Sequence, residues 1–289
     1  NGDSMVKIKN KHLTVRIDPK GAEIKSIKCD GIEKLWQGEE DSWQGTAPTL
    51  SPFCGGLKDG KFIYADKEYF CPKHGFAKDL EFTVTEKDRH HAVLTLESSP
   101  ETLEKYPFDF VLTVTFTILR QSLTVKYTVK NTGRRALYFS VGSHESYLIE
   151  GGMENCELLF PHRESLKHCV IKDGLLSGET EQLTLHSKIL ALYNKYLDND
   201  SLVIKNMVSR SVTFRKRATG ERIKIEFPGS KYFVIWSLKN KDFVCLEPWA
   251  GFPDSVDSSG KIEEKEGIIK LARHRKKTIA HRITFLPSF

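Results

Sequence analysis

The sequence predicts an all-β protein, built as a large antiparallel β-sandwich with few short helices. Two observations favour this class. Short segments in which apolar and polar residues alternate recur along the chain, and turn-forming residues separate one segment from the next. The chain also shows no regular alternation of strands with helices, which a parallel sheet would require. Several short strands with turns between them are typical of a sandwich.

The alternation begins near the N-terminus, where residues 13–17 read Leu-Thr-Val-Arg-Ile. The turn at 18–21, Asp-Pro-Lys-Gly, leads into a second strand at 22–28. The same reasoning predicts the following strand pairs and a closing strand: 61–64 with 68–70, 82–85 with 92–96, 110–119 with 122–129, 212–214 with 223–227, 234–236 with 243–246, and 279–286.

Helical signals are few. Ser99 precedes Pro100 and an acidic first turn, so we expect a short helix that Pro107 brings to an end. Residues 183–194 mix apolar and polar positions in a way that favours neither helix nor strand. The chain has neither the glycine pattern of a dinucleotide-binding fold nor that of a phosphate-binding loop.

Length and composition are consistent with one domain over residues 5–289, the residues before Met5 being interpreted as a leader or remnant. No segment has the length and apolarity of a membrane span or of a signal peptide. We therefore expect no membrane partner. The six cysteines form no Cys-x-x-Cys pair, so reduced thiols and a cytoplasmic location are expected. The sequence leaves open whether the protein is a monomer or a homodimer.

The net charge of +6 admits two interpretations. Nucleic-acid binding requires basic residues clustered on one face, whereas here Lys and Arg are scattered. The one dense run, residues 273–277, lies between apolar segments and is interpreted as a solvated turn. We therefore expect no nucleic-acid partner, while the positive charge could favour an anionic substrate such as a phosphorylated sugar.

Three segments differ from ordinary strands and turns. Residues 73–79 place Gly75 directly after His74, which would let the backbone approach another segment closely. Residues 141–147 place Gly142 shortly before His144, and a glycine within a strand pattern often marks a bulge or a close contact near a site. A turn-capping His74 and a half-buried, satisfied His144 are the structural alternatives.

The third segment, residues 245–254, ends an apolar strand with Glu247-Pro248-Trp249. Glutamate is rarely buried unless it is paired or functional. Because proline cannot continue the hydrogen-bond ladder of a central strand, we expect the strand to end at Pro248, with Glu247 at its end. Trp249 could offer the flat apolar surface that sugar sites use. A turn glutamate beside a core tryptophan is the alternative.

Taken together, these segments resemble the aldose 1-epimerase (mutarotase) superfamily, and most closely its LacX-like branch. The resemblance extends over most of the chain through six landmarks in the same order: 35–38, 51–60, 74–77, 106–108, 141–144 and 246–254. It implies a large antiparallel β-sandwich whose concave face binds a small-molecule sugar. It also implies interconversion of the α and β anomers of a free or phosphorylated hexose, without cofactor or metal.

By this resemblance His144 is the general acid and Glu247 the general base. A carboxylate and an imidazole can exchange protons near neutral pH, and each positioned group typically contributes about 10²–10⁴-fold. The remaining residues that the resemblance assigns to sugar binding are His74, Asp200, Lys78, Trp249 and Phe76.

The chain departs from the family pattern at three positions that lie within or directly after these landmarks. Gly56 and Lys78 stand where arginine is usual, and Glu145 replaces the proline that commonly follows the acid histidine. Loss of arginine at position 56 removes a fork-shaped donor that would orient sugar oxygens, and lysine is not its equivalent.

Two other function classes stay open at this stage. One is a non-catalytic sugar-binding or sensing protein on the same scaffold, which Gly56 motivates. The other is a cupin-type metalloenzyme that would use His74, His144 and Glu247 as ligands. The lack of a His-x-His pair argues against the second class.

Overall fold

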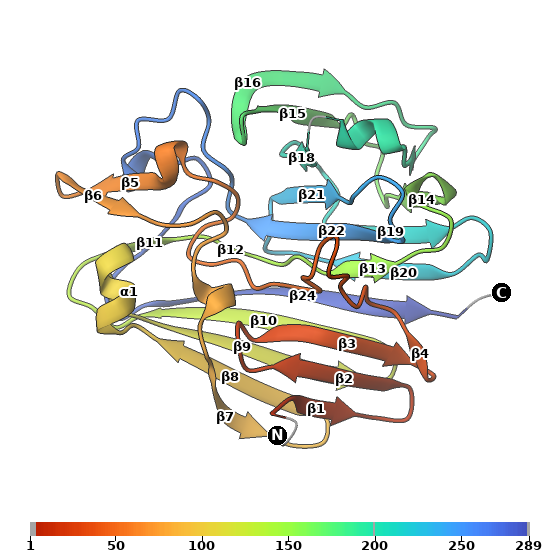
Figure 1. The fold of residues 1–289 in the computed structure, drawn as a ribbon, viewed down its shortest axis with the longest axis horizontal. Helices are drawn as coiled ribbons and strands as arrows, with labels where there is room; N and C mark the ends of the chain where they lie inside the picture. Colours follow the sequence, from red (N-terminus) through yellow and green to blue (C-terminus); the bar gives the residue numbers. More distant parts are fainter. Residues whose placement is uncertain (1–3, 199, 288–289) are drawn as a thin grey trace.

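The structure is a computed structural model that describes residues 4–198 and 200–287 of the chain. Strands dominate it, and all of the pairings between its named strands are antiparallel (Figure 1). The predicted all-β class and sandwich architecture are therefore confirmed. Two large sheets form the sandwich, and three smaller sheets complete it.

The larger sheet has nine strands and includes the longest strands of the chain. Its centre is formed by β9, β10 and β24, whose inward side chains alternate with exposed or half-buried ones. In order across the sheet, the strands are β17 (Ile189–Ala191), β14 (Cys156–Leu159), β19 (Ser211–Lys216), β20 (Arg222–Glu226), β24 (Lys276–Leu286), β10 (Ser122–Asn131), β9 (Phe110–Leu119), β8 (His91–Glu97) and β7 (Thr83–Lys87).

The second sheet has seven strands and carries the candidate site. Its central strand β22 is buried along its whole length, because one face meets the larger sheet and the other forms the floor of a cavity. In order, the strands are β12 (Val141–Gly142), β22 (Phe243–Ala250), β21 (Tyr232–Trp236), β18 (Leu202–Ile204), β15 (Lys167–Lys172) and β16 (Leu175–Gln182), with β13 (Ser146–Leu148) also paired to β22.

The smaller sheets cover the remaining surfaces. The four-stranded sheet lies over β8, β9 and β10 (Figure 1), and its apolar side chains belong to the main core. Its strands are β1 (Val6–Lys9), β2 (Leu13–Asp18), β3 (Glu23–Cys29) and β4 (Ile32–Glu33). The two-stranded sheets are β5 (Lys61–Tyr64) with β6 (Lys67–Phe70), and β11 (Leu137–Phe139) with β23 (Ile269–Leu271).

The predicted helix is present as α1 (Pro100–Lys105). Ser99 is its N-cap, where the side chains of Ser99 and Thr102 satisfy each other's backbone N–H groups. The other helical segments are short 3₁₀ turns: η1 (Lys58–Gly60), η2 (Ala77–Asp79), η3 (Met153–Asn155), η4 (Asn194–Leu197) and η5 (Ile262–Glu264).

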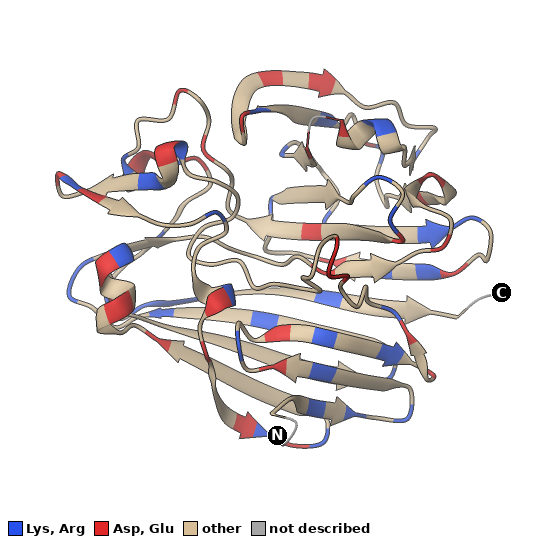
Figure 2. Cartoon of the chain, viewed as in Figure 1, with Lys and Arg blue, Asp and Glu red and all other residues tan. Residues whose placement is uncertain are grey.

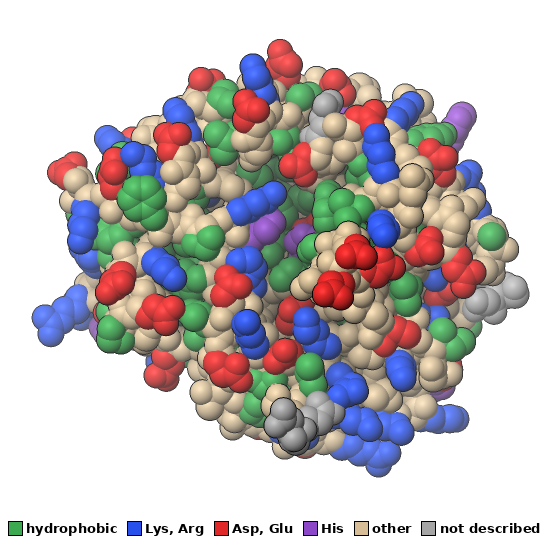
Figure 3. All heavy atoms as spheres, in the orientation of Figure 1, with side chains coloured by type: hydrophobic (Ala, Val, Ile, Leu, Met, Phe, Trp, Pro, Cys, Tyr) green, Lys and Arg blue, Asp and Glu red, His purple; other side chains and the backbone are tan. Residues whose placement is uncertain are grey.

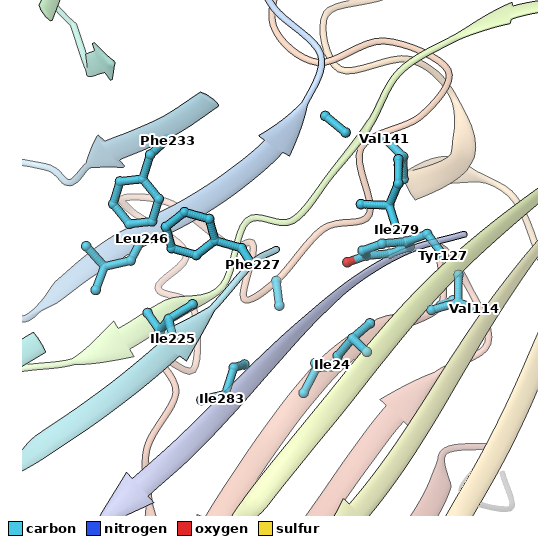
Figure 4. Close-up of a cluster of buried hydrophobic side chains, with 14 of the residues drawn as sticks. Ile24, Val114, Tyr127, Val141, Ile225, Phe227, Phe233, Leu246, Ile279 and Ile283 are labelled. Carbon is cyan, nitrogen blue, oxygen red and sulfur yellow. The ribbon is translucent and has the colours of Figure 1, made fainter. Parts of the chain in front are cut away.

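The core lies between the nine-stranded and seven-stranded sheets (Figure 4). Phe233 and Leu246 come from the seven-stranded sheet, whereas Ile225 and Ile283 come from the larger one. The rings of Phe227 and Phe233 stack with their centroids 5.1 Å apart. Burying each such side chain contributes roughly 1.5–3 kcal/mol, so this layer fixes how the two sheets face each other.

One boundary prediction was wrong. The strand expected to end at Pro248 continues as β22 through Pro248 to Ala250. Leu246 N donates to Glu145 O, and Ser143 N donates to Pro248 O, so Pro248 directs its backbone toward residues 143–145. The neighbouring strand is interrupted there, between β12 and β13. The proline therefore sits where no regular ladder bond is required, which is why the strand tolerates it.

Other expectations are met or refined. The unassigned stretch 183–194 contains the short strand β17, and the basic run forms an exposed turn that enters β24. All six cysteines are free and buried. Lys and Arg are interspersed with Asp and Glu over most elements (Figure 2).

The described residues include no helix with the length and apolarity needed to cross a membrane. Residues 1–3 of the expected leader lie outside the described part.

Candidate active site

An open cavity of about 720 Å³ lies on the face of the seven-stranded sheet that points away from the core. Because side chains alternate along a strand, β21 directs Val234 and Trp236 into the cavity, and Phe233 and Ile235 into the core. Strand β22 directs Glu247 and Trp249 into the cavity in the same way. Figure 3 shows histidine side chains at the bottom of a hollow that lysine side chains border.

Strand register brings His144 and Glu247 together. Gly142 pairs with Trp249, and Ser146 pairs with Cys245, so the residues between these pairs place His144 opposite Glu247. Opposite residues of an antiparallel pair share one face of the sheet. The His144 Nε2 and Glu247 Oε1 atoms lie 3.3 Å apart, and the two side chains are 9% and 1% exposed. Two residues far apart in the sequence thus form one contact pair on the cavity floor.

Burial changes the proton affinities of both members of the pair. Burial raises the pKa of Glu247 well above its usual range, and the Glu145 carboxylate nearby raises it further. Burial lowers the pKa of His144 to about 4. Both shifts favour uncharged side chains, because a buried charge is poorly solvated. The form that burial favours therefore carries the shared proton on Glu247 and leaves the His144 imidazole neutral.

Aromatic rings enclose His144. The Trp43 ring lies 5.0 Å from the imidazole and is tilted by 33°, and the Trp236 ring meets it edge-on at 5.7 Å. Trp249 closes another side, where its Nε1 donates to Ser143 O over 3.2 Å. These flat surfaces offer the apolar contacts that a pyranose ring uses, and they also cause the desolvation of the pair.

His74 stands beside the pair on a loop. Its ring centroid lies 5.7 Å from that of His144 and 5.6 Å from that of Trp249. Gly55 N donates to His74 Nδ1 over 2.9 Å, so the neutral ring carries its proton on Nε2 and can donate it to a ligand. Burial lowers the pKa of His74 well below its usual range, which keeps the ring neutral.

The two glycines flagged in the sequence do approach other segments closely. A Cβ at Gly75 would lie 2.2 Å from Ser51 O, and a Cβ at Gly142 would lie 2.6 Å from Trp249 Cδ1. Gly75 also has a φ of +72°, which favours glycine. These two positions therefore fix the loops that present His74 and His144.

The cavity includes most of the residues predicted to bind sugar. His74, His144, Glu247, Trp249, Lys78 and Asp200 all line it. The Lys78 ammonium is engaged by Asp79 Oδ2 at 2.8 Å and by Gly75 O at 3.2 Å. Asp200 lies in an exposed turn just before β18.

Phe76 is the exception, because it is not a wall residue. It is 3% exposed and packs against Tyr106 and Phe110 in the main core, with ring centroids 6.1 Å away in both cases. Its neighbour Gly75 turns the chain inward, so the side chain after it points away from the cavity.

The cavity-lining residues that sequence reasoning did not identify include Trp43, Trp236 and Lys73. Trp236 could have been found from its alternation with Val234 on the strand next to Glu247. Trp43 lies in the long connection between β4 and η1, where no periodic pattern predicts the direction of a side chain.

Comparison with known proteins agrees with this geometry. The family model for aldose 1-epimerase matches residues 4–277. The chain belongs to the aldose 1-epimerase family. This confirms the resemblance noted from the sequence landmarks, and the family is one of mutarotase-type isomerases.

Curated relatives and solved structures agree with this family. The LacX protein of Lactococcus lactis subsp. lactis is 32% identical over 282 residues, covering 92% of this chain and 94% of LacX. A galactose mutarotase-like protein from Lactobacillus casei superposes with a TM-score of 0.93 at 26% identity, covering 98% of this chain and all of that one. A galactose mutarotase related enzyme from Lactobacillus acidophilus gives 0.92 at 25%, covering 98% of both chains.

Proposed function

We propose that this member of the aldose 1-epimerase family interconverts the α and β anomers of a hexose, free or phosphorylated. The observation that carries the proposal is the contact of His144 with Glu247, 3.3 Å apart on the floor of an open cavity with aromatic walls. Within the described residues, Glu247 Oε1 is a buried oxygen that has this contact but no hydrogen-bond partner.

The single proton of the pair supports both halves of the reaction. Its transfer from Glu247 to His144 leaves a carboxylate and an imidazolium without changing the total charge. The Glu247 carboxylate then takes the proton from the C1 hydroxyl, C1=O forms, the C1–O5 bond breaks, and His144 delivers its proton to O5. This step returns the pair to the uncharged form that burial favours.

Closure of the ring completes the cycle. Rotation about C1–C2 presents the other face of the aldehyde, and the same proton transfers run in reverse to give the second anomer. In this scheme His74 donates from Nε2 to the sugar and Trp249 provides an apolar wall. Asp200 and Lys78, at the cavity lining, contact hydroxyl groups farther from C1.

Polarimetry tests this function directly. Purified protein should accelerate mutarotation of at least one hexose or hexose 6-phosphate above the buffer rate, and His144→Gln should abolish the acceleration. An Asp66→Asn variant, altered in an exposed turn away from the cavity, serves as control. Buffer rates for every sugar tested would overturn the enzymatic proposal.

One observation favours a second candidate, a non-catalytic sugar-binding protein. Gly56 lines the cavity where family members usually carry arginine, so a sugar would lack one orienting donor. Calorimetric binding of a hexose without any acceleration of mutarotation would support this candidate. Turnover by the wild-type protein would exclude it.

A further inference from the structure

A buried pair of ionisable side chains lies directly behind the cavity floor. Glu145 Oε1 and His281 Nε2 are 2.6 Å apart, and the two side chains are 2% and 3% exposed. Glu145 is the residue after His144, and His281 lies on β24 of the nine-stranded sheet. The pair therefore connects the two large sheets immediately below the acid–base pair.

The position of Glu145 follows from the strand register. Glu145 stands opposite Leu246, and both residues point into the core, on the face opposite to that of His144 and Glu247. Leu246 N donates to Glu145 O over 3.3 Å, so the backbone of Glu145 is tied to β22. Its side chain is tied to β24 through His281. Residues 143–145, which leave the regular ladder, are thus held from two sides.

The carboxylate of Glu145 also places a charge next to the site. Burial alone would raise the pKa of Glu145, but the contact with His281 lowers it overall, so the group is ionised. The other titratable groups that face Glu145 are Tyr127 on β10, Tyr147 on β13 and Cys245 on β22. Burial raises the pKa of each, so they stay neutral.

Tyr127 supports the pair from the larger sheet. Its ring stacks on His281 with centroids 5.8 Å apart and an interplanar angle of 21°. A buried carboxylate–imidazole contact is a costly arrangement unless it has partners, and apolar side chains would commonly be as stable. A role connected with the site accounts for the pair better than stability does.

We propose that Glu145 and His281 are positioning residues for the reaction. They hold residues 143–145 so that His144 meets Glu247, and they place a fixed negative charge behind both side chains. The inference rests on the proposed function for its kinetic consequences. It concerns residues that neither touch the sugar nor line the cavity.

The test uses Glu145→Gln and His281→Gln in the full chain. Each change should lower kcat for mutarotation by about 10- to 100-fold with little change in KM, because misplacement by about 1 Å costs this much. Removing the Glu145 charge also lowers the proton affinity of Glu247 and His144. Both limbs of the pH profile of kcat/KM should therefore move to lower pH in Glu145→Gln, which removes this charge.

Two comparisons separate positioning from a merely structural role. The kcat of the double variant should resemble that of each single variant, because the two residues position His144 as one unit. His168→Gln is the control: it removes another histidine–glutamate contact, 3.0 Å long, in which His168 is buried and Glu181 is exposed, and His168 does not line the cavity. It should leave kcat and the pH profile unchanged.

The outcomes decide the matter. An unshifted pH profile in Glu145→Gln would overturn the inference, as would an unchanged kcat in His281→Gln. Failure of both variants to fold would also overturn it, since the pair would then serve the fold alone. Calorimetric sugar binding measured against pH gives a second readout. If the wild type binds sugar without turnover, the proposed function fails. A shift of the binding profile in Glu145→Gln would still support the positioning role.

Discussion

Replacing Glu247 by glutamine tests whether this carboxylate is the base without disturbing its packing. The Glu247 side chain is 1% exposed, so its packing matters. The amide has the shape of the carboxylate, and the substitution therefore leaves no cavity. What is lost is the group that accepts the C1 proton. A positioned base is worth about 10²–10⁴-fold in kcat, or roughly 2.7–5.4 kcal/mol of barrier. Polarimetry on saturating hexose should show a loss of this size, and a variant that keeps more than a tenth of wild-type kcat would refute the reasoning.

The same variant carries an independent stability signature. Because burial raises the pKa of Glu247 in the folded protein, the folded state binds its proton more tightly than the unfolded state does. This contribution to stability is complete below the unfolded pKa and is lost as the pH rises through the folded pKa. Glu247→Gln has no such dependence. Thermal melts should therefore show that the stability difference between variant and wild type increases in the variant's favour as pH rises, and a constant difference would contradict the assignment.

Three further predictions concern the rest of the site. The acid limb of kcat/KM should lie near pH 4, which is the lowered pKa of His144. A second proton on the pair would abolish the base. An acid limb at the usual histidine pKa would contradict this prediction. Gly56→Arg should fold normally, because a Cβ at this position meets nothing closer than Gly174 O at 3.5 Å. The added hydrogen bonds should lower KM by about tenfold. An unchanged KM would show that this position does not contact the sugar. Phe76→Ala should lower the free energy of unfolding by about 3–5 kcal/mol in denaturant experiments, because Phe76 is a core residue. Its KM should change little, since the side chain does not form a sugar-binding wall. A raised KM in folded protein would reverse that conclusion.

The fold was accessible from the sequence because the signal that determines it is local. The strands predicted at 110–119 and 122–129 correspond closely to β9 and β10, along which buried and more exposed side chains alternate. The Pro248 boundary failed for the opposite reason. Whether a proline interrupts a ladder depends on what the neighbouring strand offers, and the interruption between β12 and β13 is a tertiary feature.

The site was predicted unevenly for a similar reason. His144, Glu247 and His74 carry local marks, namely a glycine nearby or a carboxylate within an apolar strand. Phe76 was assigned to the cavity wall by the family resemblance, whereas its side chain follows Gly75, which has a positive φ, and packs in the core. Trp43 had no local mark at all, and only the path of a long connection brings its ring to within 5.0 Å of His144.

The contact between His144 and Glu247 follows from one pairing, that of the strand around Gly142 with β22. The same register accounts for the division of labour between neighbouring residues. His144 and Glu247 face the cavity, where a sugar can reach them, while Glu145 and Leu246 face the core. A change of one residue in this register would exchange the two sets and bury the acid–base pair beneath the sheet. The hydrogen bonds that fix residues 143–145 to β22 are therefore as necessary to the site as the side chains themselves.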